Sequence, residues 1–231
     1  MLIIVDKKLP EPAKARLRES GWLLELETIG ITYDAISGHP DIFFTQIDDQ
    51  LIIAPNLPEK FKTRLLSLGV EFLEGSNPVG TSYPHSAIYN AAATSEFLVH
   101  NLSITDSAVL NFAGDKTLIN VKQGYTRCNL VFITHDRAIS SDLSICKKLS
   151  DATIKVLHFD PKTILLPGFG NGFFGGCCGV FDKKLWLSGN LKYHQGGQNV
   201  KEFVNGAGLD IIELYDGPLF DAGSIFFIIT P

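Results

Sequence analysis

The chain has 231 residues, of which 45% are hydrophobic and 19% charged, and its formal net charge is −5. This composition is ordinary for a globular protein with a buried core. The acidic balance argues against nucleic acid as a partner. The sequence shows no leader pattern and no apolar run near ~18 residues, which argues against a signal peptide and a membrane span. The four cysteines form no CxxC pair, which argues against zinc-ribbon and thioredoxin patterns and favours a reduced, cytoplasmic protein.

The first two predicted units are copies of one another. Leu2–Glu27 (LIIVDKKLPEPAKARLRESGWLLELE) and Leu51–Glu74 (LIIAPNLPEKFKTRLLSLGVEFLE) both run from an apolar strand through Leu-Pro-Glu to an amphipathic helix and a second apolar strand. An Ile-Phe-Phe strand follows Asp41 just before the second copy, and its counterpart for the first copy lies at the far end of the chain, in Ser224–Ile229. One unit is therefore split across the termini, which predicts a closed ring in which Ser224–Ile229 pairs with Leu2–Val5.

Three weaker units follow the same order of strand A, strand B, helix and strand C. They span Glu96–Val121, Cys128–Phe159 and Gly179–Leu214, with helices expected near 106–112, 142–150 and 198–205. The B strands of the five units are expected to begin near Leu2, Leu51, Leu102, Ala138 and Leu185. The Gly/Pro-rich stretches between units look like loops rather than linkers. We therefore expect one α/β domain over residues 1–231, built as a five-bladed pseudo-symmetric ring.

The loops that join strand C of one unit to strand A of the next are expected to surround one mouth of the ring. Superposed units place equivalent loops at the same end of the scaffold, where binding residues commonly gather. These loops are also the most polar and Gly-rich segments of the chain: 29–41, 75–91, 121–128, 166–179 and 215–224. We place the function of the protein at this mouth.

The first of these loops carries an imidazole and a carboxylate two residues apart. Pro40 fixes the backbone between His39 and Asp41. One interpretation is a general base with an orienting or ligand-binding carboxylate. The alternative is a loop closure in which Asp41 caps backbone amides.

The third loop packs Lys122, Gln123, Tyr125, Arg127 and Cys128 into seven residues. Cations beside a thiol lower its pKa and make it a better nucleophile. In the alternative interpretation Cys128 opens a strand and points into the core, where free cysteine commonly lies.

The fourth and fifth loops offer glycines, thiols and carboxylates. Gly176 can let the backbone approach a ligand closely. If one of the neighbouring Cys177 and Cys178 is buried, the other would face the mouth, and the alternative is that both pack in the core. Asp221 is the better ligand-binding carboxylate of the last loop, because Asp216 has the position of a turn residue. The histidines show no metal-ligand spacing and the glycines match no nucleotide motif, so we expect neither metal nor cofactor.

The complete pattern resembles the pentein, or α/β-propeller, fold of the guanidine-modifying enzymes. The matching phrases are SGHPDI at Ser37–Ile42, VKQGYTRC at Val121–Cys128 and GPLFDAGSI at Gly217–Ile225, and they are most similar to a bacterial branch that lacks the usual C-terminal catalytic cysteine. The resemblance implies a nucleophilic cysteine in the last loop, helped by a histidine and acidic residues. Here that loop ends in Asp221-Ala-Gly-Ser224, so the standard covalent mechanism lacks its nucleophile.

The leading interpretation is a protein that binds a small polar, cationic molecule, a guanidinium or an amine, in the mouth. The alternatives are a thiol hydrolase of the amidinohydrolase type or an amidinotransferase, acting on a guanidino C–N bond through a relocated cysteine, and a protein-interaction module like the ribosome-binding translation factor of the same fold. The catalytic candidates are His39, Asp41, Cys128, Cys177, Cys178 and Asp221. The ligand-binding candidates are His39, Asp41, Asn90, Lys122, Gln123, Tyr125, Gly176, Asp221 and Ser224. No nucleic acid or membrane partner is expected, and the oligomeric state is left open.

Overall fold

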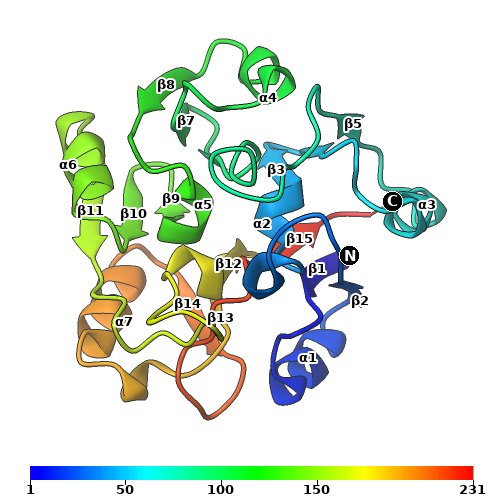
Figure 1. Ribbon diagram of the computed structural model, residues 1–231. Coiled ribbons are helices and arrows are strands. Elements are labelled where there is room, and N and C mark those ends of the chain that lie inside the picture. The colour runs from blue at the N-terminus through cyan, green and yellow to red at the C-terminus, as the bar shows by residue number, and fades with distance from the viewer. Residues whose placement is uncertain (231) are drawn as a thin grey trace.

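A computed structural model describes residues 1–230, and its five three-stranded sheets surround a common centre (Figure 1). In each sheet the middle strand is strand B, which pairs antiparallel with strand A and parallel with strand C. The predicted order of strand A, strand B, helix and strand C therefore holds in every unit. The longer helices lie at the periphery of the ring, and none of the described helices is long and apolar enough to cross a bilayer.

The sheets, in ring order, are β15–β1–β2, β3–β4–β5, β6–β7–β8, β9–β10–β11 and β12–β13–β14. Their strands are β15 Phe226–Ile228, β1 Leu2–Asp6, β2 Trp22–Leu26, β3 Phe44–Ile47, β4 Gln50–Ile53, β5 Leu73–Glu74, β6 Ala92–Ala93, β7 Phe97–His100, β8 Thr117–Asn120, β9 Leu130–Thr134, β10 Arg137–Ser140, β11 Lys155–His158, β12 Cys178–Phe181, β13 Lys184–Leu187 and β14 Asp210–Glu213. The helices between strands B and C are α1 Glu11–Arg18, α3 Glu59–Ser67, α4 Ser107–Phe112, α6 Leu143–Asp151 and α7 Gly197–Asn205. Short helical turns are α2 Pro40–Phe43, α5 Thr126–Asn129, η1 Asp34–Ile36, η2 Gly175–Cys177 and η3 Leu191–Tyr193.

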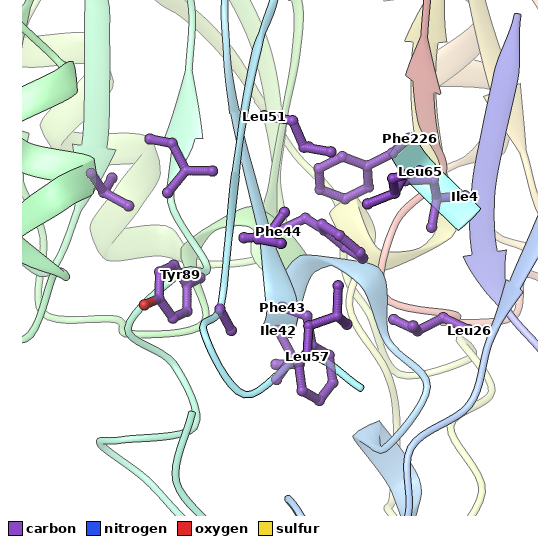
Figure 2. Packing of buried hydrophobic residues seen from close by; sticks show 14 of the residues in the cluster. Ile4, Leu26, Ile42, Phe43, Phe44, Leu51, Leu57, Leu65, Tyr89 and Phe226 are labelled. Atoms are coloured by element: carbon purple, nitrogen blue, oxygen red, sulfur yellow. The ribbon is translucent and has the colours of Figure 1, made fainter. Parts of the chain in front are cut away.

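The two termini close the ring, as the split repeat predicts. β15 pairs antiparallel with β1, with Leu2 opposite Ile228 and Ile4 opposite Phe226, and Figure 1 shows the red β15 beside the blue β1. The closing pair belongs to a core that extends into the next unit, because the Phe226 ring lies 6.2 Å from that of Phe44 in β3 (Figure 2). The buried closure removes the sheet edges that two free termini would leave exposed.

The repeat between the first two units extends to an ion pair made by a mostly buried lysine. Lys14 in α1 donates to Glu25 in β2 at 2.9 Å and to the carbonyl of Lys7. Lys62 in α3 bonds Glu74 in β5 and the carbonyl of Pro55 in the same way. In both units a mostly buried lysine thus connects the helix to strand C and to the loop that precedes the helix.

Two sequence expectations are corrected. Strand B of the third unit is β7, Phe97–His100, and does not begin near Leu102, because the chain turns after β7, where the amides of Ile104 and Thr105 donate to the carbonyl of Asn101. Cys128 does not open a strand, because it lies in the helical turn α5 just before β9.

Candidate functional site

Short helical turns bring the predicted loops together at the centre of the ring. In three units such a turn ends where strand A begins: α2 leads into β3, α5 into β9 and η2 into β12. These turns hold Asp41 in the second unit and Cys128 in the fourth. Six predicted residues are brought together and buried there: His39, Asp41, Asn90, Cys128, Asp221 and Ser224.

Asp41 is the most connected residue of this cluster. Its Oδ2 accepts hydrogen bonds from Cys128 Sγ at 3.1 Å and from Ser224 Oγ at 2.8 Å. Its carbonyl accepts from Asn90 Nδ2 at 2.9 Å. Burial raises the pKa of Asp41, and the bonds from Cys128 and Ser224 oppose this rise. The side chain of Asp41 therefore bonds a thiol and a hydroxyl, and the expectation that it caps backbone amides is wrong.

Cys128 is held as a protonated thiol. Besides the bond to Asp41, its Sγ accepts from Asn90 Nδ2 at 3.3 Å, and its amide donates to Asn90 Oδ1 at 3.1 Å. Burial raises the pKa of Cys128 well above its usual range, and the charges of Asp41 and Asp221 raise it further. The nearby cations therefore do not lower this pKa as the sequence suggested, and Lys122 lies exposed at the surface.

His39 lies between two carboxyl groups. Its Nε2 is 3.8 Å from Asp6 Oδ2 and its Nδ1 is 3.9 Å from Asp221 Oδ1. Burial lowers the pKa of His39 to about 3, and the charge of Lys8 lowers it further. Burial also raises the pKa of Asp6 to about 6 and that of Asp221 to about 7. At neutral pH the cluster therefore contains a neutral imidazole and two carboxyl groups that titrate near physiological pH.

Three buried polar atoms of the cluster have no hydrogen-bond partner among residues 1–230: Asp6 Oδ2, His39 Nδ1 and Asp41 Oδ1. Buried polar atoms are nearly always paired in native proteins. Three unpaired atoms in one cluster make it the candidate site.

One further group that these side chains could hold is a metal ion. His39, Asp41 and Cys128 offer a nitrogen, an oxygen and a sulfur that lie within 4.8 Å of one another. This donor set suits zinc, which would require the thiol to lose its proton. Sequence spacing alone missed the set, because Cys128 is 87 residues from Asp41.

A pocket of about 130 Å³ leads from the surface to one side of the cluster. Its walls are formed by Asp6, Lys8, Asp34, Ala35, His39, Leu166, Pro167, Phe220 and Asp221. Lys8 is held at the wall by Ser37 Oγ at 3.2 Å and by the carbonyl of Asp34. Asp6, His39 and Asp221 line the pocket, whereas Asp41 and Cys128 do not.

Asp6 and Lys8 are the functional candidates that the sequence interpretation missed. It considered only the loops that follow strand C. Strand B is parallel to strand C, so the ends of both strands lie at the same side of the ring. The Asp6-Lys7-Lys8 step at the end of β1 was therefore a usable signal, since it places polar side chains at the same mouth.

Other predicted residues lie outside the cluster. Lys122 is exposed, and Gln123 Oε1 accepts from the amide of Tyr125 within the same loop. The hydroxyl of Tyr125 bonds Ser86 at 2.6 Å. Asp216 is exposed and pairs with Lys192. These side chains organise loops around the mouth rather than the buried cluster.

The Gly-rich loop supports the cluster through its backbone. Cys177 and Cys178 are both fully buried, with burial raising the pKa of each well above the usual range. Both therefore pack in the core, as one of the two sequence interpretations has it, and neither faces the mouth. The carbonyl of Gly176 accepts from the amides of Ala222 and Ser224. A Cβ at Gly176 would lie 1.9 Å from Asp221 Oδ1, so only glycine leaves room for that carboxyl group.

Comparison with known proteins identifies the family and the fold. A family model described as "Family of unknown function (DUF6873)" matches residues 4–226. The chain belongs to this family. A search of curated proteins found no significant match.

Several solved structures are similar over nearly the whole chain. A DDAH from Pseudomonas aeruginosa, solved as a mutant complexed with citrulline, is 11% identical with a TM-score of 0.53, covering 92% of this chain and 91% of that chain. An agmatine deiminase from C. jejuni is 10% identical with a TM-score of 0.55, covering 91% and 74%. An amidinotransferase from Microseira wollei is 9% identical with a TM-score of 0.52, covering 91% and 87%. This likeness shows the fold alone: the chain has the five-bladed pentein fold of guanidine-modifying enzymes, as the resemblance implied.

Proposed function

We propose that the protein binds a small cationic molecule whose guanidinium or amine enters the pocket between Asp6 and Asp221. The observation that carries this proposal is that both carboxyl groups line the pocket, yet no lysine or arginine among residues 1–230 lies within ion-pair distance of either. Among the described residues, the only basic group within that distance of either carboxyl group is His39, whose pKa lies at about 3. A cationic ligand would supply the missing charge.

The electrostatics of the pocket support this ligand class. Burial raises the pKa of both carboxyl groups, and the negative charge of Asp41 raises them further, whereas the hydrogen bond and the charge of Lys8 oppose the rise at Asp6. A bound cation would reverse these shifts and stabilise the ionised forms. A planar guanidinium also offers paired N–H donors that match a carboxylate. The pocket of about 130 Å³ suits the charged end of a ligand, with the remainder of the molecule lying toward the mouth. A solved structure of the same fold, a DDAH complexed with citrulline, supports the coarser expectation of a small polar ligand.

A second candidate function is hydrolysis or transfer at a guanidino C–N bond with Cys128 as nucleophile. Its support is the contact of the thiol with Asp41 and its position within 4.8 Å of a His39 nitrogen. Against it, burial raises the pKa of Cys128 well above the usual range, and the residue does not line the pocket. A buried protonated thiol is a poor nucleophile. Binding is therefore the function that the geometry favours.

The test is a calorimetric and thermal-shift screen of arginine, agmatine, methylguanidine and spermidine, with acetate as an anionic control. For any cation that binds, Asp221→Asn and Asp6→Asn should each weaken affinity about tenfold or more, the effect of removing the charge from a charge-assisted pair. Asp216→Asn is the matched control, because Asp216 lies in the same loop as Asp221 but is exposed.

Two results decide between the candidates. Stabilisation by acetate alone, or cation binding that neither Asp6→Asn nor Asp221→Asn weakens, would contradict the binding proposal. Release of urea or ammonia from a guanidino compound, abolished in Cys128→Ser, would establish the enzyme instead.

A further inference from the structure

A second and larger cavity lies at the other end of the ring. It has a volume of about 620 Å³. Its walls are the A strands of several units and the hairpin turns that follow them: Gln46, Asp48, Asp49, Ala91, Ala92, Ala93, Thr94, Ser95, Arg127, Leu130, Val131, Phe132, Val180, Phe181 and Ile225–Ile229. The pocket of the mouth lies where the A strands begin, whereas this cavity follows them to the A–B hairpins, so the two share no residue.

Arg127 is the only cation in the wall of this cavity. Its Nη1 donates to the carbonyl of Leu130 at 3.3 Å, and its guanidinium lies 5.8 Å from the ring centre of Phe226. No carboxylate among residues 1–230 lies within ion-pair distance of it. A guanidinium carries five N–H donors, and the protein provides a hydrogen-bond acceptor for one.

The Arg127 guanidinium therefore has few hydrogen-bond acceptors in the protein. Burial lowers the pKa of Arg127, and the charge of Asp41 opposes that change, but an arginine stays protonated in a protein. A half-buried cation is costly unless an anion or several hydrogen bonds compensate it. The sequence interpretation placed Arg127 in a loop of the mouth, whereas its side chain lines the opposite cavity.

The walls define what kind of anion would fit. Val131, Val180 and Phe226 give the cavity apolar surface, and the Phe226 ring lies next to the guanidinium. Besides Arg127, the polar wall residues are Gln46 in β3 and, at the hairpin turns, Asp48, Asp49, Thr94 and Ser95. The Asp48 carboxylate there is already paired with Lys116 at 2.8 Å. An anion with an apolar body would therefore place its charge on Arg127 and its body along the A strands. The volume lies within the range of small-molecule sites.

We propose that this cavity binds a small organic carboxylate, held by Arg127 through paired N–H donors and by the apolar A strands along its body. A carboxylate is the planar anion that a guanidinium matches with two parallel hydrogen bonds. This site is independent of the cation pocket, and it stands whether or not the proposed function of the mouth is correct.

The experiment titrates 3-phenylpropionate by calorimetry and follows the Arg127 Nε–H signal by NMR. The uncharged amide of 3-phenylpropionate tests the contribution of the negative charge. Inorganic phosphate tests the contribution of the apolar body. Arg127→Gln should weaken 3-phenylpropionate binding at least tenfold, and Arg127→Lys should have an intermediate effect, since a lysine keeps the charge but loses the planar fork. Arg16→Gln, an exposed arginine of α1, is the control and should change nothing.

A second variant keeps the test decisive if Arg127→Gln does not fold. Ala93→Phe adds bulk to the cavity wall and leaves Arg127 in place. It should abolish 3-phenylpropionate binding while thermal unfolding and any cation binding at the mouth are retained. Three results would each overturn the proposal. The first is equal binding of the amide or of phosphate, and the second is undiminished binding of 3-phenylpropionate by Arg127→Gln or Ala93→Phe. The third is no binding of 3-phenylpropionate by the wild type at about 10 millimolar, roughly ten times a Kd of 1 mM.

Discussion

Replacing Asp6 by asparagine should make the protein more stable at alkaline pH. Asp6 ends β1 and is buried, with Oδ1 accepting the amide of Lys8 at 2.7 Å and Oδ2 without a partner. Asparagine keeps an oxygen for the amide of Lys8 and places an NH₂ group where the unpaired oxygen was. The substitution therefore removes a buried charge and retains the hydrogen bond that orients the side chain.

The magnitude follows from the pKa. Burial is the main cause that raises the pKa of Asp6 from 3.8 to about 6. A shift of about two pH units corresponds to about 3 kcal/mol of unfolding free energy, at ~1.4 kcal/mol per unit. Between pH 4 and 6 the folded state keeps a proton that the unfolded state releases, so the stability of the wild type falls as pH rises through this window. The stability of Asp6→Asn should not show this fall, because asparagine does not titrate.

The assay is unfolding at pH 4, 6 and 8. Urea is the denaturant of choice, since guanidinium chloride would introduce the ligand class proposed for the pocket. The two proteins should have similar stability at pH 4, and Asp6→Asn should be more stable at pH 8 by about 1–3 kcal/mol, the lower values reflecting the buried amide that lacks a good acceptor. A stability difference that is the same at pH 4 and pH 8, or an Asp6→Asn protein that is less stable at pH 8, would refute this reasoning.

Three further predictions test the ring, the thiols and the placement of the imidazole. Truncation after Gly223 should abolish cooperative folding, as judged by thermal denaturation, because it removes β15 from the first sheet; a folded truncated protein would contradict ring closure. In the folded protein near pH 7, iodoacetamide should label the three buried cysteines far more slowly than the half-buried Cys146, and rapid labelling of a buried one would favour the thiol-hydrolase candidate. Gly223→Ala should lower stability by about 1–3 kcal/mol, because Gly223 has a φ of 66° and its added Cβ would lie 2.2 Å from the Cβ of His39; an unchanged Tm and unchanged ligand binding would contradict this placement.

The architecture was largely predictable from the sequence, because the signals that set it are local and repeated. The Leu-Pro-Glu step and the flanking apolar strands recur in both copies, and the strand that the first copy lacks appears near Ser224. The short third unit was misread near Leu102, since its strand A covers only Ala92–Ala93 and too few residues alternate to show a period of two. Repetition predicts a ring, but strand boundaries depend on pairing partners that lie elsewhere in the chain.

The candidate site was predictable only in part. The loops identified His39, Asp41 and Asp221, since polar residues at equivalent loop positions gather at one end of a repeated scaffold. Only the tertiary structure showed that Asp6 joins them and that Cys128 donates to Asp41. It also reversed the expected chemistry of the thiol. Along the chain Cys128 follows cations, but in the fold it is buried against carboxylates, and both desolvation and negative charge raise its pKa. The sequence by itself determined which loops the ring brings to its mouth. Only the tertiary structure decided their protonation, because pKa depends on solvent exclusion and on charges that come from other units.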